Sequence, residues 1–129
     1  MTEKYELILN TSFISLNEYI LAERNHKIKA AKIKKEQTNK VYYLAKELKF
    51  KLPENTRFNV TFIWFAPDNR KDHDNIAFAK KFILDGLVLA KILKSDGAKY
   101  IGNFQDKFEL DKTRPYVSCI VTFIEIKLQ

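Results

Sequence analysis

Alternation of polar and apolar residues predicts four β-strands in this chain. The segment KYELIL near the N-terminus alternates and then becomes wholly apolar, and RFNVTFIWF is rich in the β-branched and aromatic residues that strands favour. Two segments nearer the C-terminus, YIGNFQDKFELD and VSCIVTFIEI, have the same character. The turn-forming sequences KSDGAK and KTRPY precede them. We therefore expect one sheet of roughly four strands.

A long helical stretch is predicted between the first two strands. From about Leu16 to Lys49 the chain has no Gly or Pro, so one long helix or two shorter ones fit. The second half has an apolar stripe whose members, at i, i+3 and i+7, are Val41, Leu44 and Leu48. The first half, RNHKIKAAKIKKEQ, has lysines around the whole helix, and a helix that is polar on all sides packs poorly. We interpret that half as a binding arm.

One more helix, NIAFAKKFILDGLVLAKIL, is predicted between the second and third strands. The element order is then strand, one or two helices, strand, helix, strand, strand, or βα(α)βαββ. This order predicts an α/β (α+β) fold with one mixed, roughly four-stranded sheet packed by helices. The 129 residues contain no internal repeat, low-complexity tract or linker, so we expect a single domain over residues 1–129.

The distribution of charge along the chain indicates a kind of binding partner. The chain has a net charge of +7. Residues 24–51 hold ten Lys or Arg and two acids, a net charge of +8, whereas the other residues hold 13 bases and 14 acids, a net charge of −1. A phosphate-binding surface requires such a local excess of positive charge. A solvated lysine-rich helix is the alternative interpretation.

Cysteine usage and hydropathy exclude several classes of protein. The single cysteine, Cys119, lies in the strand segment YVSCIVTF and is predicted to be a small buried residue. One cysteine cannot form an intrachain disulfide or a cysteine-based zinc site. No apolar run approaches the length of a membrane span, and MTEKYELILN lacks the features of a signal peptide. We expect a cytoplasmic protein with no membrane partner.

The segment KDHDN, residues 71–75, contains two aspartates that need an explanation. Asp is a favoured helix N-cap and suits the positive end of the helix dipole, which explains one of them. Asp72 and Asp74 together, followed by Asn75, are more than a cap needs. A few carboxylate oxygens are what Mg²⁺ requires of a protein. A D-x-D pair is a weak motif alone, and His73 between the two is interpreted as an exposed loop residue.

Two charged residues stand in an apolar row of the helix that follows. At about 100° per residue, Lys81 and Asp85 lie along the same line as Asp74. Their apolar neighbours in that row are Phe78, Val88 and Ile92. Unpaired charges would be costly there, and residues four apart can pair. A structural ion pair is one interpretation, but apolar residues would often serve as well, which favours a function. Asp96, in the turn SDG, joins this site only if the fold brings it back.

The block RKDHDNIAFAKKFILDGL, followed by KSDGAKYIG, resembles the RusA family of Holliday-junction resolvases, small basic endonucleases of bacteria and their phages. The family signature is D-x-D-N, a lysine, D-[AG]-L, and one or two aspartates in the next turn. The segment SLNEYI also resembles the family's early motif around an asparagine, here Asn17. The resemblance runs from Asn17 to about Ile101. The central block is its most specific part.

Two departures from the family pattern affect the site. The lysine and the D-[AG]-L aspartate lie three residues farther from the D-x-D pair than in the family, which is nearly one helical turn and keeps the same face. This spacing favours Lys81 as the catalytic lysine, with Lys80 as the alternative. Where the family often has paired acids, this chain has Ser95 and Asp96. Asp96 would then act alone.

The resemblance implies a site and a reaction. Asp72, Asp74 and Asp96 would hold Mg²⁺, with Mn²⁺ as a substitute, and Lys81 would add positive charge near the scissile phosphate. Asp85 would orient Lys81, and Asn75 would support the site. A homodimer without a small-molecule cofactor would cut four-way junctions symmetrically by phosphodiester hydrolysis in DNA recombination and repair. The residues expected to bind nucleic acid are Asn17, Lys27, Lys29, Lys32, Lys34 and Lys35.

Three other functions fit part of this pattern. A basic DNA-binding module without catalysis would use the same arm, with the aspartates as helix caps. A broader nuclease that trims flaps or other branched DNA would use every residue named above. A D-x-D phosphotransferase or phosphatase usually places its first aspartate directly at a strand end. Several residues separate Phe65 from Asp72 here, so this last function fits least well.

Overall fold

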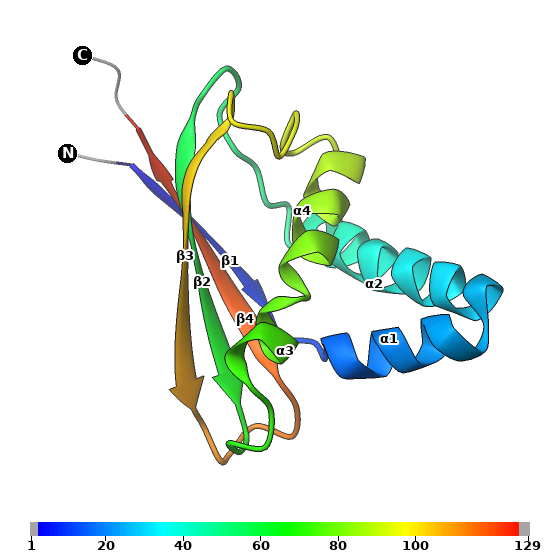
Figure 1. Cartoon of the computed structure of the whole chain (residues 1–129). Coiled ribbons are helices and arrows are strands. Elements are labelled where there is room, and N and C mark those ends of the chain that lie inside the picture. Colours follow the sequence, from blue (N-terminus) through cyan, green and yellow to red (C-terminus); the bar gives the residue numbers. More distant parts are fainter. Residues whose placement is uncertain (1–2, 127–129) are drawn as a thin grey trace.

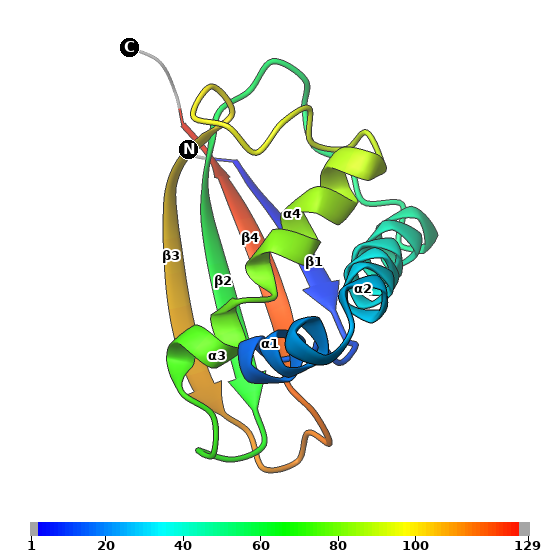
Figure 2. The same ribbon diagram turned by 45° about the vertical axis from the view of Figure 1, so that its right-hand side comes forward.

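A computed structural model describes residues 3–126 and contains one four-stranded sheet with its helices on one face (Figures 1 and 2). The elements in chain order are β1 (Lys4–Leu9), α1 (Leu16–Asn25), α2 (Lys27–Glu47), β2 (Phe58–Ala66), α3 (His73–Ala77), α4 (Lys80–Leu89), β3 (Ile101–Leu110) and β4 (Ser118–Glu125). The strands are ordered β1-β4-β2-β3, with β2 and β3 parallel and the other neighbours antiparallel. The predicted fold class and mixed four-stranded sheet are confirmed.

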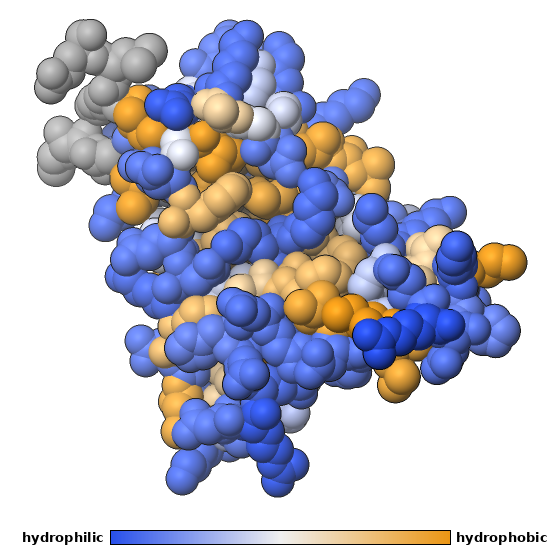
Figure 3. Space-filling view, viewed as in Figure 1, coloured by the Kyte–Doolittle hydropathy of each residue, from blue (hydrophilic) through white to orange (hydrophobic). Residues whose placement is uncertain are grey.

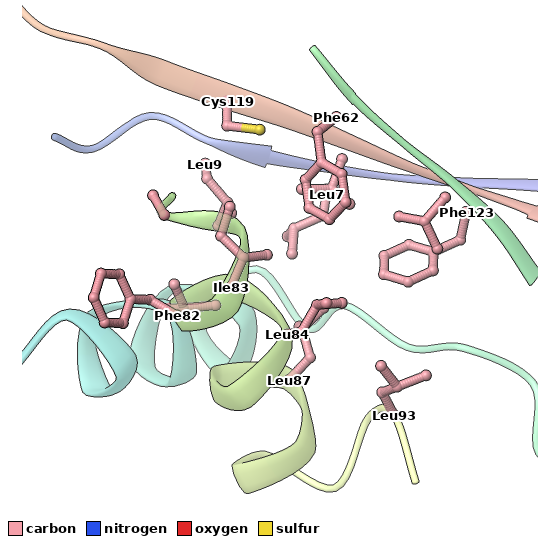
Figure 4. Packing of buried hydrophobic residues seen from close by; sticks show 14 of the residues in the cluster. Leu7, Leu9, Phe62, Phe82, Ile83, Leu84, Leu87, Leu93, Cys119 and Phe123 are labelled. Carbon is pink, nitrogen blue, oxygen red and sulfur yellow. The ribbon is translucent and has the colours of Figure 1, made fainter. Parts of the chain in front are cut away.

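Alternation along the central strands builds the core. In β2 the buried positions alternate with half-buried ones, so one face of the sheet packs on the helices. Its buried residues are Phe58, Val60, Phe62 and Trp64. On β4, Cys119 is 1% exposed, which confirms that it is a core residue, and burial raises the pKa of its thiol well above the ordinary value. Figure 4 shows Phe62 and Phe123 of the sheet facing Leu84 and Leu87 of α4.

The helix α4 contacts both the sheet and α2. Its buried residues, among them Ile83 and Leu87, belong to the same core cluster as the strand residues. A Cβ atom on Gly86 would lie 2.6 Å from the Cβ of Val41 and 2.9 Å from the carbonyl oxygen of Thr38. Only glycine therefore permits α4 to lie this close to α2. This contact fixes the position of α4, which carries the candidate site.

The helices differ from the sequence prediction at their ends. The long stretch forms two helices, which was one of the two predicted alternatives, and they are separated at His26, whose backbone is extended with φ −155° and ψ 108°. The inner residues of α2 are Ala30, Val41 and Ala45, and the predicted inner residue Leu48 is instead 53% exposed because the helix ends before it.

The predicted helix after KDHDN is also shorter than expected. It is divided into α3 and α4, with a turn between Ala77 and Lys80, and it ends at Leu89. The end is a Schellman motif: the N–H of Ile92 donates to the carbonyl of Leu87 at 3.0 Å, and Lys91, with φ 60°, is the left-handed residue.

Within the described residues, no helix is both long and apolar enough to cross a membrane.

Candidate active site

Lys81 lies between two carboxylates. Its Nζ is 3.1 Å from Oδ1 of Asp85, one turn further along α4, and 3.1 Å from Oδ2 of Asp96, in the turn after the helix. The Lys81 side chain is 57% exposed, and the side chains of Asp85 and Asp96 are 28% and 35% exposed. The hydrogen bond to Asp96, and then the one to Asp85, raises the pKa of Lys81 above 10.5. The fold therefore brings Asp96 back to the face of α4 that carries Lys81.

The Schellman motif at the end of α4 is what brings Asp96 back. It reverses the chain after Lys91, and Leu93 is then buried at 3% exposed, which holds the returning segment against the core. The Ser95 hydroxyl accepts a hydrogen bond of 3.0 Å from the backbone N–H of Gly97, so the turn around Asp96 is ordered locally.

Asp72 and Asp74 lie at the start of α3, and both are exposed. Asp72 is the N-cap residue, and its backbone carbonyl accepts hydrogen bonds from Asn75 and Ile76. Within the described part of the chain, the Asp72 side chain makes no capping hydrogen bond. The two carboxylates border a surface hollow beside the end of β3, where the His73 ring stacks on Phe108 with centroids 3.7 Å apart. Capping by the side chain therefore does not explain Asp72.

The three predicted metal ligands are divided between two places. Asp72 and Asp74 precede α4, whereas Asp96 follows it and contacts Lys81. In residues 3–126, no three or more His, Cys, Asp or Glu side chains are grouped so that they could hold a metal ion. Exposed carboxylates are oxygen donors that suit Mg²⁺, so Asp72 and Asp74 fit this ion chemically. Asp96 would have to move towards them to complete the predicted triad.

The two adjacent lysines of α4 have different surroundings. Lys80 Nζ is 2.6 Å from Oδ2 of Asp106 on β3, and it lies 5.2 Å from the centroids of two aromatic rings, Phe62 and Phe104. Trp64 Nε1 donates to the other Asp106 oxygen at 2.9 Å. Lys80 is thus engaged with the sheet, while Lys81 contacts the half-buried carboxylates of Asp85 and Asp96. This difference supports Lys81 as the candidate catalytic lysine.

Asp106 is a structural residue of the site that the sequence prediction missed. It pairs in register with Phe62 on β2, so it lies on the face of the sheet that the helices cover. The signal was available in YIGNFQDKFELD, where Asp106 occupies the same alternate row as Phe104 and Phe108. An acid in an apolar row predicts a buried basic partner.

A hydrogen bond links the start of α1 to the D-x-D-N segment. The backbone N–H of Asn17 donates to Oδ1 of Asn75 at 2.9 Å, so Asn75 satisfies a free N–H at the start of α1. Ser15 caps the same helix and pairs with Glu18. The predicted phosphate-binding side chains are all exposed: Asn17, Lys27, Lys29, Lys32, Lys34 and Lys35. The two motifs that resemble the RusA family are therefore neighbours in the fold.

Comparison with models of protein families gives no match for this chain, and comparison with curated proteins gives none either. The resemblance to the RusA family rests on the motif residues alone. The site geometry and the charge distribution are therefore what a functional proposal has to build on.

Proposed function

We propose that the chain is an endodeoxyribonuclease that hydrolyses phosphodiester bonds in branched DNA, and specifically resolves four-way (Holliday) junctions by paired symmetric cuts. The observation that carries this proposal is the cluster of Lys81, Asp85 and Asp96. Lys81 and Asp85 are on α4, and the exposed pair of Asp72 and Asp74 lies at the start of α3, directly before it in the chain. Carboxylates and a lysine in one segment are the groups that metal-assisted phosphodiester hydrolysis uses.

Each side chain of the site would have a separate task. Bound Mg²⁺, or Mn²⁺ in its place, would supply an activated water and stabilise negative charge on the phosphate. Asp72 and Asp74 would hold the ion, with Asp96 as the third ligand. Lys81 would place its ammonium group beside the scissile phosphate. Because Lys81 also pairs with Asp85, it would stay oriented after Asp96 leaves it.

The basic arm supports DNA as the substrate. Its lysines are exposed, and none of Lys27, Lys29, Lys32, Lys34 and Lys35 takes part in an ion pair within the described residues. Unpaired cations on one projecting helix are suited to backbone phosphates and to the shape of the DNA more than to its sequence. A C₂ homodimer would place two such sites on the two-fold symmetric junction. It would act in the cytoplasm of a bacterium or a phage-infected cell.

The test is incision of a labelled synthetic four-way junction. Wild type should make symmetric cuts with Mg²⁺ and none with EDTA, and Asp74→Asn should bind the junction without cutting it. The matched control is Glu54→Gln, an exposed acid that precedes β2 while Asp74 follows it, and it should cut like wild type. Cutting that survives Asp74→Asn would contradict the proposal. Equal cutting of flaps and junctions would instead assign the broader branched-DNA nuclease.

A DNA-binding module without catalysis is the second candidate. It is favoured by the pairing of Asp96 with Lys81, which leaves the three predicted metal ligands ungrouped. This candidate predicts strong, salt-dependent junction binding that responds neither to Mg²⁺ nor to Asp74→Asn. The incision assay separates the two candidates directly.

A further inference from the structure

The α1–α2 hairpin exposes a hydrophobic side chain at its tip. Ile28, the second residue of α2, is 87% exposed, more than any other large hydrophobic residue in the described part of the chain. Nothing in α1 is buried, and the hairpin projects away from the sheet (Figure 1). Figure 3 shows hydrophobic surface next to strongly hydrophilic surface at the projecting end of the hairpin. This isoleucine contributes almost nothing to the core, so its side chain is available to contact a partner.

The charges around Ile28 restrict the kind of partner. Lys27 and Lys29 flank it, and Lys32 and Lys35 follow at i+4 and i+7 on the same helix face. A protein surface that covered this tip would have to desolvate several unpaired ammonium groups for one isoleucine. A membrane would gain little, because Lys29 follows Ile28 directly, and of the two alanines after it Ala30 is buried and Ala31 offers little apolar area. Nucleic acid offers phosphates for the lysines and flat apolar base faces for the isoleucine.

We propose that Ile28 is a wedge that inserts between bases at the branch point of the DNA that the hairpin binds. This inference rests on the proposed function for its substrate, branched DNA. Inserted aliphatic side chains unstack base steps at a cost of about a few kcal/mol per step. Bases beside a branch are already incompletely paired and stacked, so the cost is lower there. The wedge would therefore prefer branched DNA to continuous duplex.

The position of the hairpin relative to the candidate site suits this role. The start of α1 is hydrogen-bonded to Asn75, immediately after Asp74. From Asn17 to Asn25 the helix rises roughly 12 Å, at about 1.5 Å per residue, and Ile28 follows just beyond. A few nucleotides of one strand, at about 3.4 Å each, cover this span. The hairpin can thus contact the branch while a nearby phosphate lies at the site.

The experiment measures base unstacking directly. A four-way junction with 2-aminopurine next to the branch, and a continuous duplex with the same label, are mixed with protein in EDTA so that neither is cut. Wild type should raise the fluorescence of the junction only. Ile28→Ala should abolish most of that rise and weaken the preference for junction over duplex by about tenfold. Ala favours helix more than Ile does, so the variant keeps α2 intact.

Matched variants separate the wedge from the charge. Leu48→Ala removes another exposed hydrophobic side chain, just after the opposite end of α2, and should unstack the branch like wild type. The double variant Lys32→Ala/Lys35→Ala should lower the slope of log affinity against log salt by about 1.8. Ile28→Ala should leave that slope unchanged, since it removes no phosphate contact.

Several results would overturn the wedge. One is no rise in fluorescence when wild type binds the junction. Another is an equal rise with wild type and with Ile28→Ala. A change of oligomeric state in Ile28→Ala would instead assign the tip of the hairpin to a protein contact. Its failure is distinguishable from failure of the proposed function. Incision by wild type with Ile28-independent unstacking removes the wedge and keeps the nuclease. Ile28-dependent unstacking without incision in Mg²⁺ removes the nuclease and keeps the wedge.

Discussion

At the scale of single residues, Lys81 has two carboxylate partners of unequal effect. Its hydrogen bond with Asp96 is the largest cause of its raised pKa, and the bond with Asp85 is the second. Asp96→Asn should therefore lower the pKa of Lys81 more than Asp85→Asn does. An NMR titration of the lysine side chains in wild type and in both variants measures this. A Lys81 pKa that is the same in wild type and in Asp96→Asn would contradict the arrangement.

The raised pKa also fixes the sign of a pH effect on stability. A base whose folded pKa exceeds its unfolded pKa stabilises the fold fully below the unfolded value, and this stabilisation is lost as pH rises through the folded value. The difference in unfolding free energy between wild type and Lys81→Met should thus be constant around neutral pH and shrink only above pH 10.5, the ordinary lysine value. Urea unfolding at a series of pH values measures it. If the difference in unfolding free energy is already lost, as pH rises, before about pH 8, the effect belongs to another group.

Lys80 and Lys81 should respond oppositely to the same substitution. Lys80→Met leaves the half-buried Asp106 carboxylate without its cation, so it should lower the unfolding free energy by about 1–3 kcal/mol. Under the proposed function it should retain incision. Lys81→Met should lower the unfolding free energy less than Lys80→Met does, and it should slow incision by about 10²–10³-fold. Urea unfolding and junction incision, measured on both variants, test the pair. The reverse pattern would make Lys80 the catalytic lysine.

At the scale of elements, α2 and α4 are each followed, directly after the C-cap residue, by a lysine in the left-handed conformation that glycine prefers. Lys49 follows α2 with φ 54°, and the N–H of Phe50 donates to the carbonyl of Ala45 at 3.0 Å, as in a Schellman motif. The left-handed conformation costs a residue with a Cβ about 1–2 kcal/mol. Lys49→Gly should therefore raise the unfolding free energy by about 0.5–1 kcal/mol, after the greater unfolded-state entropy of glycine is subtracted.

The matched control for this prediction is Lys46→Gly. Lys46 lies within the last turn of α2, where glycine should cost about 0.5–1 kcal/mol. Chemical denaturation of the two variants and wild type gives both values. If both glycines destabilise the protein equally, the left-handed cap at Lys49 is wrong.

These helix ends also show how far the sequence could predict the elements. Alternation located all four strands, because burial of one sheet face imposes a period of two residues. The C-terminal ends of α2 and α4 could not be predicted from the sequence, because each left-handed position after the helix is a lysine instead of the glycine that usually marks it. The break at His26 likewise has no Gly or Pro to announce it. Packing of the chain after each helix, as with Leu93, decides where these helices stop.

The contacts of the candidate site could likewise be predicted from the sequence only in part. Lys81 and Asp85 were predicted as a pair, because a spacing of four residues on one helix brings side chains together whatever the rest of the fold does. The approach of Asp96 required knowing where α4 ends. The partner of Lys80 required the register of β3 against β2, which sequence spacing does not contain. Local contacts were thus predictable and contacts across elements were not.

At the scale of the whole molecule, the helices cover only one face of the sheet (Figures 1 and 2). The other face carries a row of isoleucines in register across three strands: Ile8, Ile120 and Ile63. Ile8 is 52% exposed, and Ile120 and Ile63 are half-buried. Adjacent hydrophobic side chains on an open sheet face are typical of a surface that another chain covers. A second copy of this chain would satisfy the two-fold symmetry that paired cuts require.

The open sheet face should therefore hold a homodimer together. Sedimentation of wild type at micromolar concentration should give a dimer. Ile120→Lys adds one charge per subunit to the middle of the isoleucine row and should raise the dissociation constant by at least about a hundredfold. The control, Leu89→Lys, alters a 51% exposed residue on α4 and should leave the dimer intact. A monomeric wild type would contradict this interface. Since separate monomers bind independently, the two cuts in a junction would then occur at unlinked rates instead of within one complex.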